Sequence, residues 1–177
     1  MIPGNSGASV TVNNRQRRWK VNTHWLAGIA RRALELLDDA SSQLSIVLVN
    51  DATMAKLNEE YHATVGPTDI LTFDYGEGQG ELIISVECAV RQARRFRATP
   101  RRELALYVVH GILHLHGYDD VAPRDRRRMR AAERRLMTRL GQNFEFKALI
   151  SQRMAERKRS VPSTRQRSRG NEEKSNR

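Results

Sequence analysis

Residues 110–120 read HGILHLHGYDD. They begin inside the most apolar segment of the chain, residues 104–115, and extend five residues beyond it. His110 and His114 are four residues apart, so on a helix their imidazoles lie on one face. Gly117 can adopt the left-handed conformation that ends a helix, after which the chain can turn and bring Asp120 to the same point. Two imidazoles and one carboxylate, with room for a water, are typical of a catalytic rather than a structural metal site.

The spacing HxxxHxxGxxD matches the zinc-binding frame of the metzincins, with Asp120 where a third histidine usually stands. In those peptidases the residue after the first histidine is the glutamate that activates water, and here it is Gly111. The ligand frame is therefore present without the peptidase's general base, which argues for a different chemistry. His116 lies two residues beyond His114 and would face away from the pair, so we exclude it as a ligand.

The pattern of the other apolar residues predicts a small sheet and several helices around this segment. Strands are expected at residues 9–13, 44–49, 69–74 and 81–85. Helices are expected at residues 23–37 and 100–115, and from residues 51, 85 or 86, and 123 onward. Thr23, Asp51 and Thr99 are the expected N-caps, and Phe96 is expected to face the core. We therefore expect an α+β fold, a small mixed four-stranded sheet packed against about five helices, with the metal-binding helix in the core.

Length and composition suit one domain, residues 1–150, followed by a basic tail, residues 151–177. The tail has almost no apolar residues and is expected to be disordered. No apolar run approaches the roughly 20 residues that a membrane-spanning helix needs, and we expect no secretory signal. Cys88 is the only cysteine, which rules out an intrachain disulfide and favours a cytoplasmic location. We expect Cys88 to be a small buried helix residue.

The net charge of +11, from 31 Lys+Arg against 20 Asp+Glu, favours a polyanionic partner, and nucleic acid is the first candidate. Much of this charge lies on the helix expected after Pro123. Its core stripe is expected to be Met129, Ala132, Leu136 and Leu140. Most other positions are arginine: Arg124, Arg126, Arg127, Arg128, Arg130, Arg134, Arg135 and Arg139. A solvated helix face is the alternative interpretation of this charge.

The chain resembles a known family at three places in the same order. Residues 110–120 resemble the HGxLHLxGYDH signature of the YbeY-type endoribonucleases, the ribosomal-RNA maturation factors of bacteria. Leu57-Asn58 with Tyr61, followed by residues 67–73 (PTDILTF), is similar to the family's LNxx[YF]R and xTDVLSF. Residues 80–85 (GELIIS) are similar to its GDIxIS strand. The resemblance covers roughly residues 10–140 and leaves only the tail outside.

The resemblance implies a zinc-dependent, single-strand-specific endoribonuclease that acts in 16S rRNA maturation and ribosome biogenesis. It implies one Zn²⁺ per chain on His110, His114 and Asp120, with ribosomal RNA and the small ribosomal subunit as partners of a monomer. Asp120 departs from the family histidine, but a carboxylate is a competent zinc ligand. The family's arginine, which contacts the RNA phosphate, falls at His62, our candidate catalytic residue. Asp69 either orients a ligand or caps the start of a strand.

Three other functions remain open at this stage. The first is a non-catalytic RNA-binding ribosome assembly factor that retains the metal site. The second is a metallopeptidase of metzincin-like fold. Two histidines and one carboxylate are also the ligand set of non-haem iron oxygenases, which makes a third.

Overall fold

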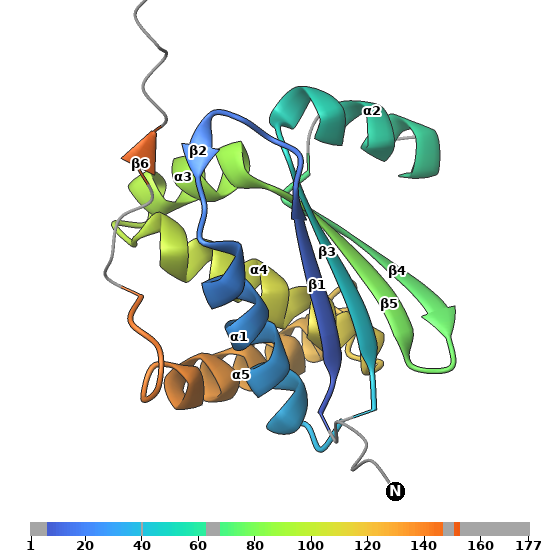
Figure 1. The fold of residues 1–177 in the computed structure, drawn as a ribbon. Coiled ribbons are helices and arrows are strands. Elements are labelled where there is room, and N and C mark those ends of the chain that lie inside the picture. Colours follow the sequence, from blue (N-terminus) through green and yellow to red (C-terminus); the bar gives the residue numbers. More distant parts are fainter. Residues whose placement is uncertain (1–6, 40, 63–67, 147–150, 153–177) are drawn as a thin grey trace, which may run out of the picture.

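The computed structural model describes residues 7–39, 41–62, 68–146 and 151–152 (Figure 1). The elements are β1 (Ser9–Asn14), β2 (Trp19–Lys20), α1 (Thr23–Glu35), β3 (Gln43–Val49), α2 (Asp51–His62), β4 (Ile70–Gly76), β5 (Gln79–Ser85), α3 (Val86–Arg95), α4 (Pro100–Leu115), α5 (Pro123–Leu140) and β6 (Ser151–Gln152). The expected α+β fold with a mixed four-stranded sheet and five helices is confirmed for these residues. The short pairing of β2 with β6 is an addition that the sequence pattern did not predict.

The main sheet has the strand order β1-β3-β5-β4. Strands β1, β3 and β5 run parallel, whereas β4 is antiparallel to β5. Strands β4 and β5 form a hairpin whose two turn residues, Glu77 and Gly78, have φ values of 50° and 73°. Two positive φ angles in a two-residue turn suit the twist of paired strands. The strands expected at residues 69–74 and 81–85 are therefore too short at this end, because the turn needs only two residues and β4 and β5 continue up to it.

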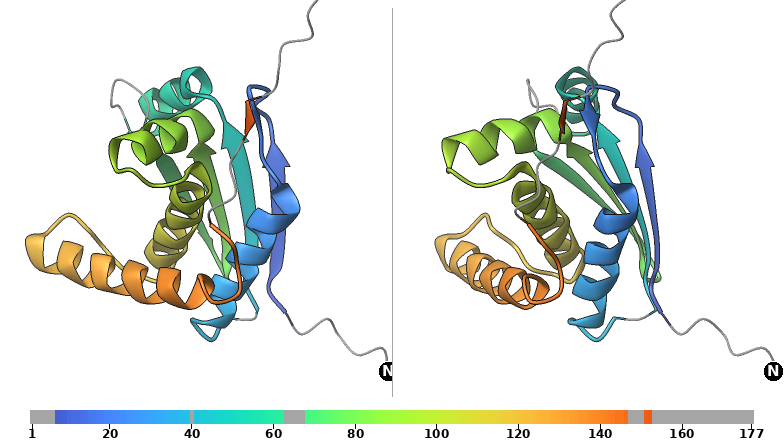
Figure 2. Two further views of the ribbon diagram at one scale, coloured as in Figure 1. Left: turned by 90° about the vertical axis from the view of Figure 1, so that its left-hand side faces the viewer. Right: turned by 60° about the vertical axis from the view of Figure 1, so that its left-hand side comes forward.

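Helix α4 lies in the middle of the domain, between the sheet and the other helices. It packs against β4 and β5 on one side and against α1, α3 and α5 on the others (Figure 2). Its apolar residues Leu104, Val108, Val109, Ile112 and Leu113 are fully buried. Helix α2 covers part of the opposite face of the sheet, where a smaller apolar cluster surrounds Met54. The prediction that α4 runs through the core is confirmed.

The close approach of α4 to the sheet depends on Gly111. A Cβ atom at this position would lie 2.5 Å from Leu82 Cδ2 and 2.8 Å from Ile70 Cδ1. Both distances are shorter than van der Waals contact, and Leu82 is completely buried. Only glycine therefore fits at residue 111 without moving the helix or its neighbours.

The N-caps of α1 and α2 are asparagines that precede the predicted residues by one position. Asn22 caps α1 rather than Thr23, and Asn50 caps α2 rather than Asp51. Each asparagine side chain accepts a hydrogen bond from the backbone N–H three residues later, at 2.9 Å and 2.8 Å. The carboxylate of Asp51 accepts a hydrogen bond of 2.6 Å from Ser85 Oγ instead.

Two further sequence predictions fail at the ends of helices. Helix α1 ends at Glu35 rather than near Leu37, because Asp38 adopts a left-handed φ of 58°. Phe96, predicted to face the core, is 64% exposed just beyond α3. The chain reverses there through Arg97, whose φ is 54°. Neither left-handed residue is a glycine, so the sequence carries no obvious stop signal at these points.

Other predictions about the chain's organisation have mixed outcomes. Cys88 is buried, as expected. None of the helices within the described residues is long and apolar enough to cross a membrane. Apart from residues 151–152, whose backbone pairs with β2, the predicted tail lies outside the described residues. Its disorder and the domain boundary at residue 150 stay predictions.

We expect Gly111→Ala to destabilise the domain although alanine is the better helix former. The added methyl group must displace Leu82 or Ile70, and overpacking of this kind costs about 1–3 kcal/mol against a gain of about 1 kcal/mol in helix propensity. Thermal unfolding should show a Tm lower by about 2–4 °C. Gly28→Ala in α1 is the comparison variant: a Cβ there lies 3.2 Å from Phe144, so the ring must shift by only a few tenths of an ångström and Tm should fall less than in Gly111→Ala. An unchanged or raised Tm for Gly111→Ala would contradict the close packing.

Candidate metal centre

The two ends of α4 set the position of the histidines. Thr99 caps the helix as predicted, with its hydroxyl accepting a hydrogen bond of 3.3 Å from a backbone N–H of the first turn. At the other end Gly117 has a φ of 76°. The N–H groups of Gly117 and Tyr118 bond the carbonyls of His114 and Leu113 at 2.9 Å and 3.0 Å. This is a Schellman motif, and it turns the chain back so that Asp120 faces the helix.

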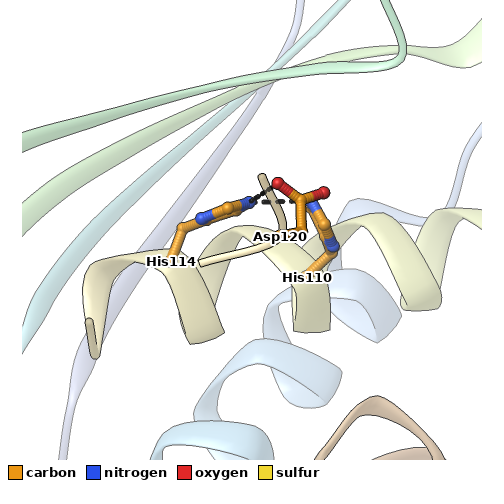
Figure 3. Close-up of side chains that lie close together, drawn as sticks. All are labelled: His110, His114 and Asp120. Atoms are coloured by element: carbon orange, nitrogen blue, oxygen red, sulfur yellow. Dashed lines mark hydrogen bonds and ion pairs between the residues drawn. The ribbon is translucent and has the colours of Figure 1, made fainter. Parts of the chain in front are cut away.

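The three candidate ligands meet at one point (Figure 3). The Nε2 atoms of His110 and His114 are 3.0 Å apart. Asp120 Oδ2 lies 4.0 Å from His110 Nε2, and Asp120 Oδ1 lies 4.0 Å from His114 Nε2. One ligand atom from each residue lies within 4.8 Å of the other two, and within the described residues this is the one such group of histidine, cysteine and carboxylate side chains. We call it the ligand cluster, and it is the arrangement that the sequence spacing predicted.

The donor atoms of the ligand cluster fit a divalent metal ion. Zinc–nitrogen bonds of about 2.0–2.1 Å in a tetrahedral site separate the ligand atoms by about 3.3 Å. The two histidine nitrogens are 3.0 Å apart, slightly closer than this value, and one oxygen of Asp120 lies within 4.8 Å of both nitrogens. Small side-chain rotations are therefore enough to bring imidazole and carboxylate donors to bonding distance. The cluster could hold a metal ion, and the geometry leaves its identity open.

Glu133 on α5 orients the first histidine, and sequence analysis missed it. Its carboxylate accepts a hydrogen bond of 2.8 Å from His110 Nδ1. Assigned from this bond, the proton lies on Nδ1, so that Nε2 presents a lone pair to the ligand cluster. The available signal was local, because Glu133 is the acidic member of a stripe shared with buried Met129, Ala132 and Leu136. An acid on the buried side of an arginine-rich helix needs a partner.

Two opposing effects set the proton affinity of His110. Burial disfavours the imidazolium and lowers the pKa of His110. The hydrogen bond and the charge of Glu133, with smaller contributions from Asp120 and Asp69, outweigh burial, and the pKa is raised above its ordinary value. The surroundings of the ligand cluster therefore attract positive charge. The same negative field favours a bound cation.

A polar cavity of about 440 Å³ opens beside the ligand cluster. Its walls come from β4 and the residues just before it, and from α4: Thr68, Asp69, Ile70, Leu71, Thr72, Asp74 and Leu115. Asp69 Oδ1 accepts hydrogen bonds from Ile70 N at 2.9 Å and from Thr68 Oγ1 at 3.2 Å. Asp69 thus caps the start of β4, one of its two expected roles, while it also faces the cavity.

The other two histidines of the sequence analysis differ in outcome. His116 Nδ1 lies 2.8 Å from the carbonyl oxygen of Ile112, and Nε2 lies 3.1 Å from a carboxylate oxygen of Asp39. His116 is therefore engaged away from the ligand cluster, as predicted. His62 is the last residue of α2, but its side chain lies outside the described residues. Its catalytic role stays a prediction.

The fold and the site define a class of protein: an α+β domain whose central helix carries a metzincin-like ligand frame without the peptidase glutamate. Residues 11–141 match the family model described as Endoribonuclease YbeY. The chain is 32% identical over 146 residues to the endoribonuclease YbeY of Syntrophotalea carbinolica, covering 76% of this chain and 97% of that protein. It is 34% identical over 138 residues to the endoribonuclease YbeY of Geobacter metallireducens, covering 72% of this chain and 92% of that protein. The chain belongs to the YbeY endoribonuclease family.

A solved structure supports the same fold. The solution structure of TM1509 from Thermotoga maritima matches with a TM-score of 0.56 at 22% identity. The match covers 75% of this chain and 88% of that protein. At this identity the likeness concerns the arrangement of helices and strands alone.

We expect Glu133→Ala to weaken Zn²⁺ binding by about 10- to 100-fold, because His110 loses the partner that fixes its tautomer and ring orientation. Glu133→Gln should recover part of the affinity, since its amide oxygen can still accept the Nδ1 proton. Competition with a chromophoric chelator measures the affinity. Asp125→Ala, which removes a negative charge from the same helix away from His110, should bind normally. Equal loss in both alanine variants would assign the effect to charge alone.

Proposed function

We propose that this protein is a Zn²⁺-dependent endoribonuclease that cuts single-stranded RNA during 16S rRNA maturation and ribosome biogenesis. One Zn²⁺ per chain would be held by His110, His114 and Asp120. Family membership supports RNA as the substrate. The observation that carries the proposal is the ligand cluster, whose donor atoms lie within 4.8 Å of one another at the wall of a polar cavity.

The proposed chemistry divides between the ion and the residues around it. A Zn²⁺ ion in the ligand cluster would lower the pKa of a water and polarise a phosphoryl oxygen. Glu133 keeps the proton of His110 on Nδ1 and leaves Nε2 as a donor to the ion. Thr68 and Thr72 line the same cavity. The hydroxyl of Thr68 donates to Asp69, whereas that of Thr72 could donate to a phosphate or ribose oxygen.

Carboxylates around the cavity support a requirement for a cation. Asp69, Asp74 and Asp120 all line it, together with the two histidines. A phosphodiester approaching these carboxylates would be repelled unless positive charge stood between them. We therefore expect a metal ion to be needed both for the RNA phosphodiester to bind near the cavity and for its cleavage.

The three rival functions make different demands on the same residues. A metzincin-like peptidase needs a glutamate at position 111, where even a Cβ would collide with Leu82 and Ile70. This packing argues against the peptidase, and a casein cleavage assay tests it.

A non-catalytic assembly factor would bind RNA without cutting it. A non-haem iron oxygenase would contain iron, which metal analysis of the purified protein detects.

The proposed substrate also suggests where the protein works. Ribosomal RNA maturation would place it in the cytoplasm with the small ribosomal subunit as its partner. We expect the chain to act there as a monomer.

We expect the wild-type protein to contain about one Zn per chain and to cut single-stranded ribosomal RNA in a chelator-sensitive way. His114→Ala should lose both the metal and the cleavage, because two ligands do not hold the ion. Elemental analysis and gel-resolved cleavage measure these outcomes. His24→Ala replaces an exposed histidine of α1 and should behave as wild type. Metal content without cleavage would favour the assembly factor, and a metal-free wild-type protein would refute the site.

We expect His62→Ala to lower kcat for RNA cleavage while the zinc content stays at the wild-type level. The reason is that His62 is proposed to position or protonate the phosphate, not to bind the ion. His62→Arg, which restores the residue type that the family resemblance places there, should keep activity at or above wild type. Unchanged kcat in His62→Ala would remove this residue from the proposed mechanism.

A further inference from the structure

The arginines of α5 are exposed and mostly lack acidic partners. Arg126 donates to the backbone carbonyls of Asp120 and Val121 at 3.0 Å and 2.9 Å. Arg128 lies 4.0 Å from the carboxylate of Asp125. The other arginines of this helix form no ion pair with any described residue: Arg124, Arg127, Arg130, Arg134, Arg135 and Arg139. So much unpaired charge of one sign on one helix suits a polyanionic partner.

Helical spacing divides most of these arginines into two rows. Positions four or seven apart lie on the same side of a helix. The inner row consists of Arg126, Arg130 and Arg134, and Arg127, seven residues before Arg134, lies at its edge. The outer row consists of Arg124, Arg128, Arg135 and Arg139. Each row is defined by sequence spacing on a helix that is continuous from Pro123 to Leu140.

The inner row lies on the side of α5 that adjoins the ligand cluster. Its first member, Arg126, bonds the backbone of Asp120 itself. Glu133, which contacts His110, is three residues from Arg130 and seven from Arg126, so it lies beside them on the helix. In the left view of Figure 2, α5 crosses below α4, and the yellow-orange end of α5, which follows the loop from α4, projects away from the rest of the domain.

The outer row lies on the other side of the helix. Its member Arg128 has its guanidinium 5.8 Å from the ring centre of Tyr118. Tyr118 belongs to the turn after α4 and is absent from both the ligand cluster and the walls of the cavity. The two rows therefore carry similar charge but differ in their position relative to the site.

We propose that the inner row binds the ribose-phosphate backbone of single-stranded RNA as the strand leaves the ligand cluster. Guanidinium groups bind phosphate in a bidentate manner, and successive members of the row are about 6 Å apart along the helix. The acidic cavity offers the phosphates little attraction of its own, so the neighbouring strand needs a cationic contact outside it. This inference rests on the proposed function for its choice of ligand.

Two double variants with equal charge change test the inference. Arg130→Gln/Arg134→Gln alters the inner row, and Arg135→Gln/Arg139→Gln alters the outer row. All four residues are exposed, each pair is four residues apart, and none forms an ion pair with a described residue. Binding of a fluorescein-labelled single-stranded RNA oligonucleotide to the metal-loaded protein is measured by stopped-flow anisotropy, before cleavage is detectable, over a series of salt concentrations.

The inner-row variant should bind RNA more weakly than wild type at low salt. The slope of its plot of log K against log salt concentration should be smaller in magnitude by about 1.4, the value for two lost phosphate contacts. The outer-row variant should stay close to wild type. Equal loss in both variants, greater loss in the outer-row variant, or no loss in the inner-row variant would overturn the inference. Should the inner-row double variant fail to fold, Arg130→Gln alone should lower the slope by about 0.7, and an unchanged slope overturns the inference.

This measurement is independent of the proposed function. Loss of binding confined to the inner row in a protein that cuts no RNA would uphold the inference and reject the nuclease. Metal-dependent cleavage together with equal loss of binding in the two double variants would uphold the nuclease and reject the inference. In a protein that cleaves, the inner-row variant should raise KM for RNA with kcat little changed, because the contact is the same before and during the reaction.

Discussion

The burial of α4 against β4 and β5 is the constraint on which the site depends. Helix α4 packs against the sheet and against α1, α3 and α5, which holds it from rotating about its axis, so its histidines keep one direction toward the cavity. Gly111 permits this packing, because any larger residue there would push the helix off Leu82 and Ile70. The position that carries the catalytic glutamate in metzincins is here part of the helix–sheet interface. The same residue therefore fixes the ligand cluster and removes the peptidase chemistry.

The charges of the molecule are not evenly distributed: the chain is basic, but the surroundings of the ligand cluster are acidic. The chain carries a net charge of +11, yet the cavity beside the ligand cluster is lined by Asp69, Asp74 and Asp120, and Glu133 supports His110 from behind. Negative groups gathered in a basic protein raise the pKa of His110, which shows that the local field, not the overall charge, governs the site. A cation held there gains from this field.

The sequence was sufficient where the decisive interactions are local. His110, His114 and Asp120 lie within eleven residues, so helical periodicity and one glycine turn determine their meeting. Glu133 was missed because its contact with His110 spans 23 residues and depends on how α5 packs against α4. The ends of α1 and α3 were missed for another reason. Asp38 and Arg97 adopt left-handed conformations that a reader of sequence expects of glycine.

Where the resemblance to the family implies a third histidine, this chain has Asp120, and with a metal ion bound this difference would change the charge of the site. A third imidazole would leave the charge of a bound divalent ion undiminished, whereas a carboxylate cancels part of it. The phosphate would then be held less strongly at the ion itself. Cationic contacts outside the cavity become correspondingly more important. Arg126, the first member of the inner row, donates a hydrogen bond to the backbone carbonyl of Asp120. A weaker hold on phosphate at a metal ion in the ligand cluster and a phosphate-binding arginine row beside it would complement each other.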